Sequence, residues 1–403
     1  MSRFTSGLRK TVKVVALLLI AGIAVLAFAI SRSPSCEAYV PPAANTPTMK
    51  AVISRCYGGP EALEYVDVPK PVPTEDEVLV RVHAAAINPL DWHYMRGEPY
   101  VMRLESGIGR PKMQGMGVDF AGVVEAVGSK VTKFKPGDEV FGAAGGSLAE
   151  FVTVREVRNI VRKPSNVSFA EAAAVPIAAV TALQALRDKA RVKAGDRVLV
   201  NGASGGVGTY AVQIGKALGA EVTGVASTRN VELVRSIGAD AVVDYTQQDF
   251  THGSVKYDVI VDNVGSHSLR AYTRVMPDNG VVVLIGSTGK GAWLGPLGHS
   301  MLSLWQSLFV SQKAEMLMAQ IEPQELSYLG DLLESGKVKS VIDRRYPLDQ
   351  AIEAIDYLEK GRARGKVVVD VIAESPPVRL AALVPKPMVH LTRYHRVFAP
   401  HSR

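Results

Sequence analysis

A glycine-rich turn between a predicted strand and a predicted helix limits the possible folds of this chain more than any other feature. Residues 198–200 form a short apolar run that is typical of a buried strand, and four glycines follow within residues 202–208. A helical pattern covers residues 209–218, and a second strand is predicted at residues 221–226. Glycines at this spacing let the backbone approach a pyrophosphate, and the helix N-terminus offers free N–H groups. We therefore predict an α/β fold in which a dinucleotide binds to a doubly wound parallel sheet.

The turn and the end of the second strand supply the first candidate cofactor contacts. An NAD site usually has an acidic residue at that strand end for the ribose 2′-hydroxyl, whereas this chain has Ser227, Thr228 and Arg229. Two hydroxyls and a guanidinium suit a 2′-phosphate, so we predict NADP(H). In the alternative interpretation, the hydroxyls only cap a helix over residues 230–237 and Arg229 is a solvated charge. The turn residues expected at the pyrophosphate are Ala203, Ser204, Gly205, Gly206, Val207 and Gly208.

The formal net charge of +7 is carried by the two ends of the chain. Residues 1–48 contain five basic residues and one acidic residue, and residues 376–403 contain five basic residues and no acidic one. The part between them is therefore slightly acidic, which argues against nucleic acid as a partner. Cys36 lies in the N-terminal segment and Cys56 near the start of the main body, so we expect no disulfide within that body.

An apolar run over residues 14–30 follows basic residues and is about as short as a membrane-spanning helix can be. We predict that it is a single transmembrane helix and that residues 1–48 form an anchor and linker, with the N-terminus in the cytoplasm. A second interpretation is a cleaved signal peptide, because residues 27–29 resemble a cleavage site. In a third, translation starts at Met49 and the protein is cytoplasmic.

A series of short motifs runs through residues 49–373. They are Tyr57-Gly-Gly-Pro-Glu, Asn88-Pro-Leu-Asp91, Gly117-Val-Asp-Phe-Ala-Gly122, Lys135-Pro-Gly-Asp-Glu-Val-Phe141, Ala174-Val-Pro176, Ala203-Ser-Gly-Gly-Val-Gly208, Asp262-Asn-Val-Gly265 and Arg364-Gly-Lys-Val-Val368. In this order they resemble the zinc-independent quinone oxidoreductase branch of the medium-chain dehydrogenase/reductase superfamily. The resemblance implies a GroES-like β-rich catalytic domain over residues 49–178 and 321–373, a Rossmann NADP-binding domain over residues 179–320, and usually a homodimer.

The same resemblance separates this chain from the zinc-dependent alcohol dehydrogenases. Asn88 stands where that branch has a ligand cysteine, and Val118 and Asp119 stand where it has His-Glu. The four-cysteine structural lobe is also missing. A catalytic zinc needs three protein ligands and a structural zinc needs four, so we predict no metal site.

Without a metal, hydrogen-bond donors must stabilise charge on the substrate oxygen. By carry-over from matching family positions, Asn88 and Tyr57 are the candidate catalytic residues. Asn88 can equally be the N-cap of a helix that runs to Arg96, because it precedes a proline. We interpret Asp91 as an acid in the first turn of that helix, where the helix dipole favours it. We expect Asp119 to stabilise the fold and not to take part in the chemistry.

Five more positions are candidate cofactor contacts by family position or by their place at strand ends. For Thr181 the alternative is a helix hydroxyl bonded to a backbone carbonyl, and for Tyr245 it is an aromatic at the rim of the core. Asn263 and Gly286 lie at strand ends that should face the cofactor. These positions are Thr181, Tyr245, Asn263, Gly286 and Lys366.

Two late segments do not follow the general pattern. Residues 289–320 are apolar nearly all round, and we expect a buried helix at the substrate cleft and dimer face, with a second membrane contact as the alternative. Residues 374–403 resemble a fragment of an insertion-sequence transposase, and we expect a disordered, dispensable tail. Contact of this basic tail with acidic lipid or nucleic acid is the alternative.

The sequence as a whole predicts an NADPH-dependent, metal-free reductase that transfers hydride to quinones or to other activated carbonyl and enone acceptors. A non-catalytic, membrane-associated protein that binds NADPH with the same fold is the alternative, because a fold does not fix a function.

Overall fold

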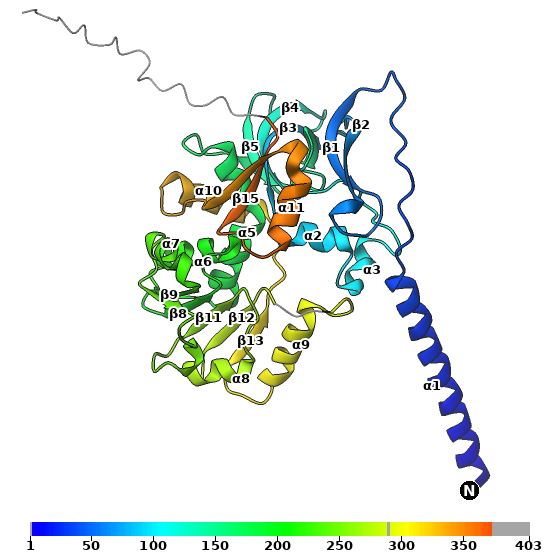
Figure 1. Ribbon diagram of the computed structural model, residues 1–403, viewed down its shortest axis with the longest axis vertical. Helices are drawn as coiled ribbons and strands as arrows, with labels where there is room; N and C mark the ends of the chain where they lie inside the picture. The colour runs from blue at the N-terminus through cyan, green and yellow to red at the C-terminus, as the bar shows by residue number, and fades with distance from the viewer. Residues whose placement is uncertain (1, 288–290, 373–403) are drawn as a thin grey trace, which may run out of the picture.

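The computed structural model describes residues 2–287 and 291–372. Two β-sheets, each with helices packed on it, make up the body, and one long N-terminal helix projects away from them (Figure 1). The residues of the predicted transposase-like tail lie outside the described part. The domain boundaries stay predictions.

The first sheet has six parallel strands in the order β10-β9-β8-β11-β12-β13, which confirms the predicted doubly wound Rossmann sheet. Its inner strands β8, β9, β11 and β12 contain several valines and are buried on both faces, as parallel sheets require. Strand order reverses between β8 and β11, so a crevice for ligand opens at the carboxyl ends of these two strands. The bounds are β8 Arg197–Asn201, β9 Glu221–Ala226, β10 Ala241–Asp244, β11 Val259–Asp262, β12 Val281–Leu284 and β13 Lys313–Met316.

Helices cover both faces of this sheet. On the central strand, Val198 and Val200 pack into a core shared with α5, α6, α7 and α10, whereas Leu199 packs into a second core with α8. This alternation follows from the period of two along a strand. The bounds are α5 Pro176–Leu183, α6 Gly206–Ala217, α7 Val231–Ser236, α8 Leu269–Tyr272 and α10 Pro323–Glu334.

The second sheet is the GroES-like part, with strand order β14-β15-β3-β4-β5-β7 and β6 paired with β3. The last described strand, β15, lies between β14 and β3, so the chain returns to this sheet after the Rossmann strands. A hairpin of β1 and β2 lies beside it (Figure 1). The bounds are β1 Thr48–Ser54, β2 Leu63–Pro69, β3 Glu77–Ile87, β4 Asp119–Val127, β5 Glu139–Ala143, β6 Phe151–Arg155, β7 Ile160–Arg162, β14 Ile342–Pro347 and β15 Lys366–Asp370. The helices are α2 Pro89–Arg96, α3 Arg103–Ser106, α4 Phe169–Ala173 and α11 Ala351–Glu359.

The N-terminal helix α1 spans Ser2–Ser31, and the prediction of a transmembrane helix at residues 14–30 is not supported. Among the residues that the structure describes, no helix has both the length and the apolar character needed to cross a bilayer. The end of α1 is bound to protein instead: Ile30 is buried, and its carbonyl accepts a hydrogen bond from Arg103.

The predicted buried helix at residues 289–320 is also corrected. The segment contains α9 at Pro296–Ser307 and then the edge strand β13, and several large apolar side chains of α9 are exposed. Trp293, just before α9, packs edge-on against Tyr100 of the other sheet's domain, with ring centroids 5.3 Å apart. The segment therefore contacts a turn of the GroES-like part, but it is not a buried helix, and its place at the substrate cleft stays a prediction.

Candidate active site

The glycine turn joins β8 to α6 with the geometry that a bound pyrophosphate needs. Gly202 has a φ of +76°, a left-handed conformation that favours glycine. A Cβ on Gly208 would lie 2.1 Å from the Gly202 carbonyl oxygen, so only glycine lets α6 pack this closely. Gly205, the N-cap of α6, has no cap from a side chain, and a Cβ there would meet only one carbonyl at 3.5 Å. The open side of the turn thus presents free N–H groups to an anion.

Asn230, in the short turn after β9, forms hydrogen bonds to the glycine turn that were not predicted from the sequence. Its Nδ2 donates to Ser204 Oγ at 3.0 Å and to Ser227 Oγ at 3.3 Å. Its Oδ1 is buried without a hydrogen-bond partner among the described residues. A buried acceptor of this kind is satisfied by a donor from a ligand or water, so it fits the edge of a cofactor site.

The predicted 2′-phosphate contacts Thr228 and Arg229 lie in different surroundings. Thr228 donates its hydroxyl to Asp244 at 2.6 Å, an acid at the end of the next strand. Tyr245 follows it with a side chain that is 61% exposed, in keeping with an aromatic at a rim. Arg229 is exposed and lines a cavity of about 740 Å³ together with residues from the far end of the chain. The cationic members of that set are Arg229, Arg344, Lys360, Arg362 and Arg364.

Two further predicted contacts lie where β11 and β12 end. Asp262 accepts from the N–H groups of Val264 and Gly265, and this closes the turn that carries Asn263. Asn263 donates to the Asn201 carbonyl at 2.9 Å, and its buried Oδ1 has no partner among the described residues. Gly286 packs so closely that a Cβ would lie 2.2 Å from the Asn263 carbonyl oxygen.

Asn88, Asp119 and Lys366 form a buried polar network beneath this crevice. Lys366 Nζ donates to Asn88 Oδ1 at 2.5 Å and lies 3.3 Å from an Asp119 carboxylate oxygen. Asn88 Nδ2 donates to the same carboxylate at 2.9 Å and makes a longer bond, 3.4 Å, to the Ala86 carbonyl. The main-chain N–H of Ile177 donates to the other Asp119 oxygen. Lys366 therefore holds Asn88, and its contact with the cofactor stays a prediction.

Burial changes the protonation of the two acids in this region. It raises the pKa of Asp91 to about 7, although the Asn88 main-chain N–H that donates to its carboxylate opposes the shift. Burial likewise raises the pKa of Asp119, and the adjacent Lys366 ammonium opposes it. Asp91 is thus the first-turn acid that the sequence predicted, because it binds the N–H at the start of α2.

The hydroxyl groups of Tyr57 and Thr181 both donate hydrogen bonds to backbone carbonyls of the protein. Tyr57 donates to the Gly107 carbonyl at 2.7 Å and lies 2.8 Å from Ser106 Oγ. Burial raises the pKa of this phenol. Thr181 donates to the Ile177 carbonyl one turn earlier, the contact given above as its alternative.

A cavity of about 180 Å³ lies between the start of α2 and the Tyr57 region. Asp91 and Tyr94 line it from α2, and Ser106, which contacts Tyr57, lines it from the opposite side. The wall between them is the loop that precedes β4, residues 111–118. The predicted catalytic residues do not line this cavity themselves, but each contacts a residue that does: Asn88 contacts Asp91, and Tyr57 contacts Ser106.

Comparisons with known proteins match these features. Residues 74–165 match the alcohol dehydrogenase GroES-like domain, and residues 237–369 match the zinc-binding dehydrogenase family. A chloroplast envelope quinone oxidoreductase homolog of Arabidopsis thaliana is 36% identical over 340 residues, which are 80% of this chain and 98% of that protein. The chain belongs to the quinone oxidoreductase-like family of medium-chain dehydrogenases/reductases.

Two further members are similar over most of their length. The 2-methylene-furan-3-one reductase of Solanum lycopersicum is 38% identical over 336 residues, which are 80% of this chain and 79% of that protein. The solved quinone oxidoreductase of Coxiella burnetii superimposes with a TM-score of 0.71 at 32% identity and covers 81% of this chain and all of that one.

The residues of this family member fit a dinucleotide and do not fit zinc. The open turn at Gly205 and the unpartnered oxygens of Asn230 and Asn263 are what a dinucleotide would satisfy. At the position of the zinc ligands, an ammonium group already neutralises Asp119. In residues 2–287 and 291–372, no cluster of His, Cys, Asp and Glu could hold a metal ion.

Proposed function

We propose that this chain is an NADPH-dependent reductase of quinones and related activated carbonyl or enone acceptors, working without a metal. The observation that carries the proposal is the course of the Lys366 side chain. Its Cδ would lie 3.3 Å from a Cβ on Gly206, at the pyrophosphate turn, and its Nζ reaches Asn88. The cofactor turn and the predicted catalytic amide are therefore joined by a single side chain.

The protein's part in the reaction is to position groups and to stabilise charge. A bound reduced nicotinamide supplies the hydride, and the reduced acceptor takes a proton from water. Lys366 and Asp119 fix the plane of the Asn88 amide through one bond to its oxygen and one to its nitrogen. The remaining Nδ2 hydrogen makes only the long bond to the Ala86 carbonyl, and we expect the substrate oxygen to share this fixed donor as charge develops there.

The cationic cavity at Arg229 supports NADPH over NADH. Arg229 comes from the Rossmann part, and its Nη2 donates to the Arg362 carbonyl at 3.3 Å. A 2′-phosphate at this position would meet guanidinium groups from both parts of the chain, whereas a ribose hydroxyl would gain much less.

The edge strand β13 and the apolar surface beside it support a homodimer. β13 ends the six-stranded sheet, so one side of it carries unpaired backbone groups. Trp305, Leu308 and Phe309 nearby are each more than half exposed. A second copy of the chain would cover both features.

The test is turnover by the purified protein. Incubation with NADPH and a panel of quinones and enones should oxidise the cofactor, measured by loss of its absorbance, in proportion to protein concentration. Tight NADPH binding with no turnover on any acceptor would instead favour the non-catalytic alternative.

A further inference from the structure

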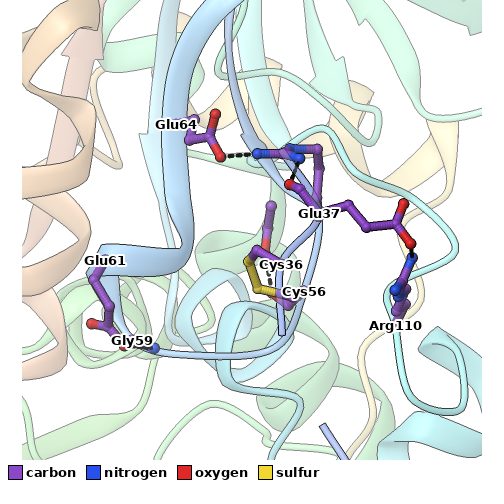
Figure 2. The surroundings of a disulfide bond; sticks show 9 residues. Cys36, Glu37, Cys56, Gly59, Glu61, Glu64 and Arg110 are labelled. Atoms are coloured by element: carbon purple, nitrogen blue, oxygen red, sulfur yellow. Dashed lines mark hydrogen bonds and ion pairs between the residues drawn. A yellow bond between two sulfur atoms is a disulfide. The ribbon is translucent and has the colours of Figure 1, made fainter. Parts of the chain in front are cut away.

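The segment that leaves α1 is attached to the catalytic part by a disulfide. Cys36 pairs with Cys56, and Figure 2 shows this bond beside Glu37, which also pairs with Arg110. We call residues 30–37 the N-terminal strap. The bond lies outside the main body in the sense predicted from the sequence, because it joins the body at Cys56 to the segment before it at Cys36. Cys56 directly precedes Tyr57, so the strap is fastened next to a predicted catalytic residue.

Arg103 connects the strap to that residue. The side chain is only 2% exposed, and its Nη1 donates to the carbonyls of Ile30, Ser31 and Arg32 at 3.0, 3.4 and 3.3 Å. These carbonyls lie at the C-terminal end of α1, where the helix dipole favours a cation. In the described part of the chain, the hydrogen-bond acceptors of Arg103 are carbonyls and include no carboxylate. Nη1 depends on the strap for its partners, and a buried cation without them is costly.

The same guanidinium lies over the ring of Tyr57, whose hydroxyl contacts the cavity-lining residue Ser106. Its Cζ is 4.4 Å from the centroid of the Tyr57 ring and 4.5 Å from that of Tyr100. Arg103 also begins α3, which ends at Ser106, the residue that lines the cavity and contacts the Tyr57 hydroxyl. The strap therefore holds, through one buried side chain, both Tyr57 and one wall of the cavity.

We propose that the strap is a redox-released clamp on the acceptor cavity, an inference that rests on the function proposed above. With the disulfide intact, Arg103 keeps Tyr57 and α3 in place and the cavity retains its shape. A dithiol reductant attacks the exposed Cys36 sulfur, the Sγ–Sγ bond breaks, and two electrons and two protons convert it to two cysteine thiols while the reductant becomes a disulfide. The freed strap leaves Arg103, and the acceptor binds more weakly.

The cofactor should not respond to this change. Its predicted contacts on the glycine turn and at Arg229 are held by Asn230 and by the Arg362 carbonyl and not by the strap, so reduction should alter the KM for the acceptor and spare the Kd for NADPH. Loss of hydrogen bonds to a charged group gives an expected rise in KM of about 5- to 20-fold, with kcat within about twofold.

The experiment compares oxidised protein, protein treated with dithiothreitol, and the variant Cys36→Ser, in the full-length chain. Cys36 is exposed, so its replacement should leave the fold intact, and Ser35→Ala is a matched control that keeps the disulfide. We expect reduced protein and Cys36→Ser to share the raised KM and faster amide hydrogen exchange over residues 103–116, with no effect of dithiothreitol on the variant. Ser35→Ala should behave as the oxidised protein does.

Amide exchange makes the result independent of turnover. Equal exchange over residues 103–116 in the oxidised and reduced forms would overturn the clamp, as would two titratable thiols in the unreduced native protein. An unchanged KM in Cys36→Ser would do the same. If no acceptor is turned over in any form, the proposed function fails, and the exchange data alone then decide whether the strap holds this loop.

Discussion

Lys366 and Asp119 are both almost fully buried, and each depends on the other to make its charge tolerable. Lys366→Met leaves a buried carboxylate without its counter-charge, so we expect a loss of about 3–5 kcal/mol in unfolding free energy, measured by urea denaturation. The double variant Lys366→Met/Asp119→Asn should recover part of the loss, because an amide needs no counter-charge. Lys130→Met, at an exposed ion pair with Glu75, should change stability by less than about 1 kcal/mol. An equally small effect of Lys366→Met would contradict the argument.

Asp91 predicts a pH dependence of stability. Burial raises its pKa from 3.8 in the unfolded chain to about 7 in the fold, so its contribution is present in full below pH 3.8 and is lost as the pH rises through 7. Asp91→Asn removes this titration. Relative to the variant, the wild type should therefore lose stability between about pH 4 and 7, by at most about 1.4 kcal/mol for each pH unit. Denaturation curves at several pH values measure the difference, and parallel pH profiles would show that Asp91 titrates normally.

Arg229 is the residue through which the choice of cofactor can be tested. Arg229→Ala should weaken NADPH binding roughly 10- to 100-fold and leave NADH binding nearly unchanged, since a charge-assisted contact to the 2′-phosphate is lost. Titration of both cofactors by fluorescence measures this. Arg235→Ala, which removes an exposed arginine paired with Glu232, is the control. Equal losses for the two cofactors would rule out the 2′-phosphate assignment.

For single residues of the candidate site, the sequence predicts their positions in the chain better than their roles. Asn88, Asp91 and Lys366 were all singled out, because motifs carry residue identities. The contact between Lys366 and Asn88 could not be foreseen, since the two are separated by 278 positions and the meeting of β15 with β3 brings them together. Asn230 was visible beside Arg229, but its bond to Ser204 requires the actual course of the glycine turn. The basic cluster at residues 360–364 was visible as well, and only the fold brings it to Arg229.

Among the elements, α9 and β13 carry the proposed dimer contact. Phe309→Asp places a charge on the apolar surface next to β13, so we expect a dimeric wild type and a largely monomeric variant in light scattering coupled to size-exclusion chromatography. Val157→Asp changes an equally exposed apolar residue of the catalytic part and should leave the dimer intact. A wild type that is monomeric at all concentrations would end the dimer proposal.

The predicted elements agree with the structure where the pattern is strongest. β9 begins and ends at the predicted residues, 221–226, because an apolar run bounded by turns is a clear signal. β13 was missed: Lys313–Met316 is a short edge strand with two charged residues, and it carries little apolar periodicity. The apolar run in α1 was read as a membrane span because a sequence does not show that Ile30 is buried against the body.

For the whole molecule, the central chemical prediction is that the reaction needs no metal. Dialysis against a strong chelator should leave turnover unchanged, since the positions of the zinc ligands hold Asn88, Val118 and Asp119. Metal analysis of the active protein provides the comparison. Stoichiometric zinc that is lost together with turnover, and restores it on return, would overturn the proposal.

The placement of β15 has a consequence for how this chain is made. The strand occupies an interior position between β14 and β3, yet Asp370 at its end is almost the last residue of the described chain. During synthesis the Rossmann strands β8–β13 leave the ribosome in one continuous stretch, whereas the Ala84–Ile87 end of β3 lacks its partner on one edge until β15 is made, nearly three hundred residues later. The nascent GroES-like part therefore stays open to aggregation until β15 has been made, and chaperone dependence should concentrate there.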